Sequence, residues 1–269
     1  MSVTAPTGSA PVEPAGHVPG AFAPRPGRAG TLAMLLAQTR MELTLILRNG
    51  EQVLLNLIVP LGLLVVCTKI PFIEVSGERA DFFVPGVLAL AVMSAAFTGQ
   101  AIATGFDRQY GVLKRLGATA LPRTILLGAK TCAVLVIELL QVAVLCLAGI
   151  ALGWEPHGNP LSVAVLIGVG TAAFCGMAFL MAGLLRAMTT LALANIVWFL
   201  LLVFGGIAFP LHELGGAADL MELLPTGALS NGLRMVLETG EVAPVTDVLV
   251  LGAWAVVTLT GAALTFRWE

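Results

Sequence analysis

Hydrophobic residues dominate the chain from about residue 53 onward, and they are arranged in six long runs separated by short polar stretches. Each run is near the ~20 apolar residues that a helix needs to cross about 30 Å of hydrocarbon. The pattern therefore predicts an all-α integral membrane protein with six transmembrane helices. The expected spans cover residues 53–70, 82–105, 125–152, 161–185, 189–209 and 245–266.

The segment before the first span divides into two parts. Residues 1–30 are rich in Pro, Gly and Ala and lack the apolar content that would repay ordering, so we expect a disordered tail. Residues 31–50 have helical periodicity and suit an amphipathic helix lying in the membrane interface, with Gln38, Arg40 and Glu42 away from its apolar stripe. A helix packed as in a soluble protein is the alternative. The apolar stripe consists of Leu32, Leu35, Leu36, Leu43, Ile46 and Leu47.

Composition supports the division into a tail and a six-span domain over residues 51–269. Hydrophobic residues make up 58% of the chain and charged residues 11%, against about 45–50% and about 25% in soluble domains. Lysine and arginine set membrane orientation, and they are unevenly distributed. If both termini share one side, that side holds eleven of these residues and the other holds only Lys69, Arg79 and Arg234. We therefore expect both termini to be cytoplasmic.

A charged segment, residues 106–123, separates the second and third expected spans. Asp107 is expected to N-cap a short helix that ends at a left-handed Gly117, and Pro122 prevents the helix from joining the next span. This helix would offer a basic face and a small apolar edge to a soluble partner. The basic residues of the segment are Arg108, Lys114, Arg115 and Arg123, and the edge consists of Tyr110, Leu113 and Leu116.

The connection over residues 210–244 is too long for a turn and too apolar for an ordinary loop. We expect two short helices, broken at Pro225, that dip into the outer leaflet and act as a gate, with Glu213 and Glu241 at the surface. An amphipathic cap on the membrane surface is the alternative. The expected gate residues are Leu223, Leu224, Pro225, Leu229 and Leu233.

Few polar side chains fall inside the expected spans. Asn56, Glu138 and Gln141 are candidates for a substrate pathway, and Lys130 is near enough to a span end to reach the membrane surface. A carboxylate within a span is costly unless it is paired or hydrated, so Glu138 is expected to face protein and to bond Gln141 one helical turn away. A structural hydrogen bond between helices and a contact with substrate both remain possible for Glu138.

Several kinds of chemistry lack their usual residues. The chain has no GxxxxGK[ST] loop for nucleotide phosphates. Its three histidines are scattered, which argues against a histidine metal site, and its four cysteines suit packing inside spans. We expect neither a metal site nor a nucleic-acid partner.

The order of these parts resembles the permease subunit of ABC-2 type exporters, most closely those of the daunorubicin-resistance type. The family pattern after the second span is matched by Asp107-Arg108, Gly111, Leu113-Lys114-Arg115-Leu116 and Pro122. Family members often have Glu at the first position and Thr before the proline, where this chain has Asp107 and Leu121.

The resemblance implies that a separate ABC ATPase subunit binds ATP and Mg²⁺ and acts on residues 107–116 as a coupling helix. A second copy of this chain, or a related permease, would complete the pathway. The protein would then be an efflux pump subunit of the cytoplasmic (inner) membrane that exports an amphipathic drug or lipid-like molecule and gives antibiotic resistance. The implied coupling residues are Asp107, Arg108, Tyr110, Gly111, Leu113, Lys114, Arg115 and Leu116.

Two other classes are compatible with a multi-span chain. A secondary transporter driven by an ion gradient would need paired carboxylates or unwound helices at mid-membrane, and Glu138 is the only acidic residue central to an expected span. A membrane-embedded enzyme would need clustered catalytic carboxylates or histidines near one leaflet, and the sequence shows none.

Overall fold

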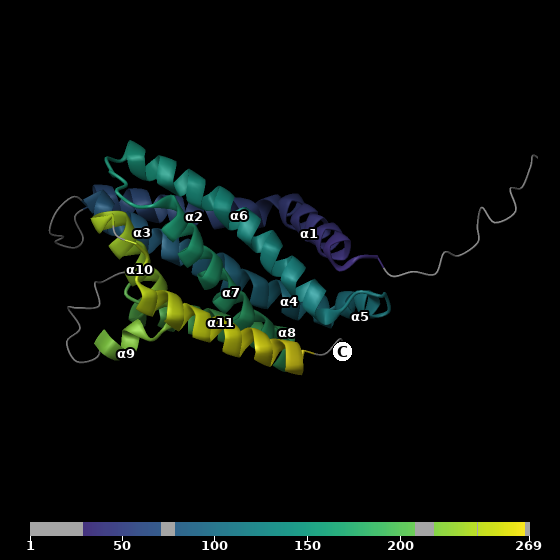
Figure 1. Cartoon of the computed structure of the whole chain (residues 1–269). Coiled ribbons are helices and arrows are strands. Elements are labelled where there is room, and N and C mark those ends of the chain that lie inside the picture. The colour runs from purple at the N-terminus through teal and green to yellow at the C-terminus, as the bar shows by residue number, and fades with distance from the viewer. Residues whose placement is uncertain (1–28, 71–78, 208–217, 241, 267–269) are drawn as a thin grey trace, which may run out of the picture.

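The computed structural model describes residues 29–70, 79–207, 218–240 and 242–266, and within these ranges every regular element is a helix. The expected all-α membrane fold is confirmed. Figure 1 shows an elongated bundle with α5 near one end and α9 and α10 near the other, hereafter the α5 end and the α10 end. The elements are α1 (Thr31–Arg48), α2 (Gly50–Lys69), α3 (Arg79–Met93), η1 (Ser94–Gly99), α4 (Gln100–Gln109), α5 (Val112–Gly117), α6 (Arg123–Ala151), α7 (Pro160–Leu184), α8 (Ala187–Phe204), α9 (Ala218–Glu222), α10 (Pro225–Thr239) and α11 (Val245–Thr265).

Five helical segments among the described residues are long and apolar enough to cross a membrane. They are Arg79–Gln109, Arg123–Ala151, Pro160–Leu184, Ala187–Phe204 and Val245–Thr265, which correspond to the second to sixth expected spans. The first expected span is α2, which is bent by 68° from α1 and counts as a sixth only if the two are taken as one broken span. The chain is therefore a multi-pass membrane protein, with five or six spans among the residues that the structure describes.

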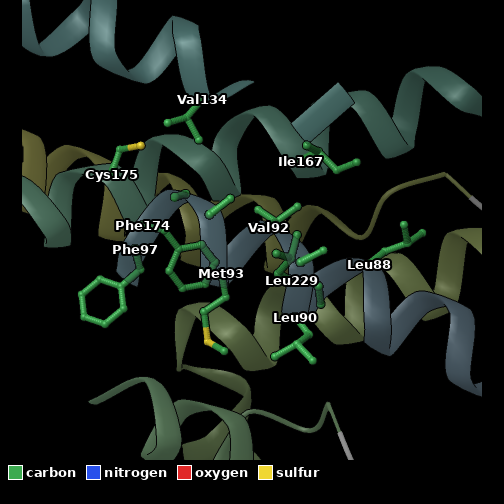
Figure 2. Close-up of a cluster of buried hydrophobic side chains, with 14 of the residues drawn as sticks. Leu88, Leu90, Val92, Met93, Phe97, Val134, Ile167, Phe174, Cys175 and Leu229 are labelled. Carbon is green, nitrogen blue, oxygen red and sulfur yellow. The ribbon is translucent and has the colours of Figure 1, made fainter. Parts of the chain in front are cut away.

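The second span, formed by α3, η1 and α4, is the most buried of these segments. Its side chains pack against α6, α7 and α10, so the apolar core surrounds it. Figure 2 shows Leu88, Met93 and Phe97 of this span in one buried cluster with Phe174 of α7 and Leu229 of α10. In η1 the backbone is wound as a π-helix, and the Ser94 hydroxyl there accepts a hydrogen bond of 2.9 Å from the Trp198 indole of α8.

Helix α1 packs along α6 at the α5 end, and its packed face is polar rather than apolar. Gln38 and Glu42 are its buried residues, whereas Leu32 and Leu36 of the apolar stripe are 67% and 60% exposed. Gln38 and Glu42 lie away from the apolar stripe, but they are buried in the bundle, which the sequence did not predict. Buried partners on α6 and α4 draw them inward, and the exposed leucines are left for lipid, which satisfies apolar side chains as well as protein does.

The described part of the segment before the last span contains two short helices, as expected, but Pro225 does not end the first of them. Helix α9 ends at Glu222, and Pro225 is the first residue of α10. A backbone N–H at that position makes no hydrogen bond within the helix, so proline is tolerated there. Leu229 and Leu233 are fully buried against the bundle, whereas Leu223 is 57% exposed. Glu213 and Glu241 lie outside the described residues.

Helix α10 is also held near its middle by polar contacts. The Ser230 hydroxyl donates to the backbone oxygen of Gly205 at 2.8 Å. The Arg234 guanidinium donates to the backbone oxygen of Ile207 at 3.2 Å and lies 4.3 Å from the centre of the Phe82 ring. Burial lowers the pKa of Arg234, and the nearby Glu238 carboxylate partly opposes this shift. These contacts fix α10 to α3 and to the end of α8.

Candidate functional site

The charged segment after the second span forms two helical pieces, not one. Helix α4 continues through Asp107 to Gln109, the chain turns at Tyr110 and Gly111, and α5 then begins at Val112. Gly111 has a φ of 72°, which a residue with a Cβ rarely adopts, and it occupies the N-cap position of α5. The expectations of an Asp107 N-cap and a left-handed Gly117 are both wrong, because the left-handed residue comes before α5.

Asp107 instead forms an ion pair inside the bundle. Its carboxylate lies 2.8 Å from the Lys130 ammonium of α6, which is also 3.0 Å from the Glu42 carboxylate of α1. The Gln38 side chain donates to the other oxygen of Glu42 at 2.9 Å. The expectation that Lys130 reaches the membrane surface is therefore wrong. Its ammonium lies between two carboxylates that come from different helices. We refer to Glu42, Lys130 and Asp107 as the ion cluster.

Two arginines of the charged segment donate hydrogen bonds to the C-terminal ends of transmembrane helices. Arg108 donates to the backbone oxygens of Ala182 and Gly183, at 3.1 and 2.7 Å, near the end of α7. Arg123 donates to the backbone oxygen of Phe266, just after α11, at 2.9 Å. The last carbonyls of a helix have no helical partners and carry partial negative charge, so a guanidinium stabilises them. Arg108 and Arg123 thus contribute to the fold rather than to a free basic face.

Replacing Arg108 by glutamine is expected to lower the thermal stability of the purified protein. The half-buried guanidinium makes charged hydrogen bonds, and such bonds contribute about 1.5–3 kcal/mol each. Arg115→Gln, which changes an exposed arginine of α5, should leave the melting temperature in detergent unchanged. Equal melting temperatures for the two variants would contradict the capping role of Arg108.

Helix α5 is anchored by one residue and exposes its charges. Leu113 is fully buried and Leu116 is half-buried, whereas Lys114 and Arg115 are exposed. Tyr110 is 66% exposed, and its ring is stacked on Phe106 with 5.8 Å between the ring centres. The surface of Tyr110, Lys114 and Arg115, hereafter the α5 surface, is therefore aromatic and basic, and it lies outside the helical bundle.

A cavity of about 620 Å³ opens beside this surface, between the end of α4 and the turn from α7 to α8. Arg108, Gln109 and Arg186 are among its lining residues, together with Leu185 and Met188. The α5 end therefore presents both a protruding helix and an adjacent basic cavity.

Of the candidate pathway residues, Glu138 and Gln141 are buried and Asn56 is half-buried, and the three do not form one site. The Thr171 hydroxyl of α7 donates to the Glu138 carboxylate, which is fully buried, and the Gln141 amide donates to the backbone oxygen of Asn56 in α2. The expected bond between Glu138 and Gln141 is wrong, because neighbouring helices supply closer partners for each. Each residue instead joins α6 to a different helix.

The cluster formed by Gln38, Glu42 and Lys130 with Asp107 was not predicted from sequence. The periodicity of residues 31–50 placed Gln38 and Glu42 on a polar face, and nothing in the sequence indicated that this face would be buried. Their spacing of four residues, which puts both on one side of a helix, was the only available signal. Among the described residues, no group of three or more His, Cys, Asp or Glu side chains is placed to hold a metal ion.

A bundle of apolar helices, with a basic helix presented at one end, defines a multi-pass membrane protein that can receive a soluble partner. The family model of the ABC-2 type transporter matches residues 34–237, and the chain belongs to this family. It is therefore the permease component of an ABC transporter, which works with an ABC ATPase in a membrane. A search of curated proteins finds no match to the chain.

Proposed function

We propose that this permease exports an amphipathic drug or lipid-like molecule, and that its ATPase partner acts on the α5 surface. The observation that carries the proposal is that Lys114 and Arg115 are exposed on a helix that Leu113 anchors in the core. A partner that moves α5 would therefore also move the bundle. ATP and Mg²⁺ would bind to the partner, and closure of two ATPases would require two permease chains, identical or related.

The nature of the substrate is inferred from the polarity of the bundle. Glu138 and Gln141 are each bonded to a neighbouring helix through one atom, and the other carboxylate oxygen of Glu138 and the amide oxygen of Gln141 are buried without a partner among the described residues. Few other polar side chains inside the spans could recognise a hydrophilic solute. This supports an amphipathic substrate and a mainly structural role for Glu138 and Gln141. Export in the manner of the daunorubicin-resistance type, with resistance to an antibiotic as its result, is the specific activity that we propose.

Reversing the charges of the α5 surface is expected to abolish binding of the ATPase. Lys114→Glu combined with Arg115→Glu changes two exposed side chains, so the membrane fold should remain intact. The measurement is co-purification of the ATPase with tagged permease. Lys69→Glu, which reverses an exposed charge at the α10 end, is the control and should retain binding. Wild-type recovery of the ATPase by the α5 variant would exclude this surface as its binding site.

Cysteine labelling from outside intact cells is expected to distinguish the two ends of the bundle. In a background lacking Cys67, Cys132, Cys146 and Cys175, an impermeant maleimide should label cysteine introduced at exposed Glu238. Cysteine introduced at Lys114 should react only after permeabilisation, because we propose that the α5 end is cytoplasmic.

The same reagent tests the proposed gate. Cysteine introduced at Leu229 or Leu233 should react slowly from either side, because both positions are fully buried. In the orientation test above, labelling of Lys114→Cys in intact cells would show that the α5 end lies outside the cell, contrary to the proposal. Rapid labelling of Leu229→Cys and Leu233→Cys would instead contradict a gate that is closed at rest.

A further inference from the structure

The ion cluster joins three parts of the chain that are distant in sequence. Lys130 of α6 is 88 residues from Glu42 of α1 and 23 residues from Asp107 of α4. The side chains of Lys130 and Glu42 are only 5% and 9% exposed, and that of Asp107 is 32% exposed. The cluster is therefore buried on the α1 side and more open toward α5.

Its location connects the α5 surface to α1. Asp107 lies in the last turn of α4, directly before the turn that leads into α5. Glu42 lies on the inner face of α1, and Gln38 fixes the orientation of its carboxylate. The outer face of α1 carries exposed leucines, so the contacts that hold this helix to the bundle are all on the inner face.

An ion cluster is not the only kind of contact that could hold α1 in place. Buried ion pairs can often be replaced by apolar residues with little loss of stability, whereas breaking one by removing a partner is strongly destabilising. Separating Lys130 from its two carboxylate partners therefore costs free energy. A displacement of one of the three residues consequently favours a displacement of the others. An apolar contact at this place would allow α1 to slide against α6 without such a constraint.

We propose that the ion cluster is a coupling joint, in which Lys130 transmits a displacement of α5 through Asp107 to Glu42 and hence to α1. Glu42, Lys130 and Asp107 are positioning residues in this scheme, since they act through the helices that carry them. The inference rests on the proposed function, because it requires that the ATPase displace α5.

The test is hydrogen–deuterium exchange on the complete complex of permease and ATPase, with and without Mg-ATP and vanadate. In the wild type, we expect nucleotide to change the exchange of amides in both α5 and α1. Glu42→Gln retains the shape of the side chain but removes its charge, and Lys130 keeps Asp107 as a partner. In this variant, the nucleotide-dependent change should persist in α5 and be lost in α1.

Two further variants test whether the three residues act in series. Asp107→Asn should also abolish the nucleotide-dependent change in α1. The charge-free variant Glu42→Gln, Asp107→Asn and Lys130→Met, which leaves no unpaired charge in the cluster, should lose no more of that change than either single variant. Glu238→Gln, the same substitution in an exposed carboxylate at the α10 end, is the matched control and should retain both changes.

The outcomes separate the inference from the proposed function. If nucleotide changes nothing in wild-type α5, the proposed action of the ATPase on α5 fails. If α5 responds but wild-type α1 does not, or if α1 still responds in Glu42→Gln, the coupling joint is wrong and the proposed function stands. A Glu42→Gln variant whose α1 exchanges faster without nucleotide, yet keeps its full nucleotide-dependent change, would show that the cluster only stabilises the fold.

Discussion

Replacing Lys130 by methionine is expected to prevent recovery of most of the folded protein. The substitution leaves the Glu42 and Asp107 carboxylates close together without the ammonium that lies between them. Removing one partner of a buried pair costs about 3–5 kcal/mol, a large part of the roughly 5–15 kcal/mol by which native proteins are stable. The measurement is the yield of monodisperse protein in detergent, together with its melting temperature.

Two further variants distinguish an electrostatic cause from a packing defect. The triple variant Lys130→Met, Glu42→Gln and Asp107→Asn removes every charge of the cluster and should recover much of the lost stability. Lys69→Met, which alters an exposed lysine, should behave like the wild type. A triple variant as unstable as Lys130→Met alone would show that the shape of the lysine, and not its charge, is what the fold needs.

Substituting alanine for Gly176 is expected to disrupt the packing of α7 against α11. A Cβ at this position would lie 2.9 Å from the backbone nitrogen of Leu259 and would collide with the Thr258 hydroxyl. That hydroxyl has one proton, which faces the Trp254 oxygen of its own helix at 2.7 Å and the Ala173 oxygen of α7 at 3.3 Å. Added atoms in a packed interface cost about 1–3 kcal/mol, so the melting temperature should fall.

The same helix supplies a matched control. Gly168 of α7 has no atom within 4 Å of the place where a Cβ would lie. Gly168→Ala should therefore be neutral or stabilising, because alanine is favoured over glycine in helix interiors by about 0.5–1 kcal/mol. If both alanine variants melt at the wild-type temperature, α7 and α11 do not pack as closely as the structure indicates.

The sequence by itself determined the class of fold and the position of most spans. Long apolar runs force a helix wherever the chain enters hydrocarbon, because every backbone N–H and C=O must be bonded within the segment. The second to sixth expected spans therefore match α3–α4, α6, α7, α8 and α11 closely. The charged segment was also identified from sequence, because Lys114 and Arg115 cannot continue an apolar span.

Only the tertiary structure decided which way the polar side chains point. A membrane helix is apolar toward lipid as well as toward protein, so periodicity does not show which face is buried. The partners of Glu42, Arg108 and Glu138 lie on other helices, 88, 74 and 33 residues away. A buried charge takes whichever partner the packing of helices brings near it, and that arrangement is a property of the whole bundle rather than of any local pattern.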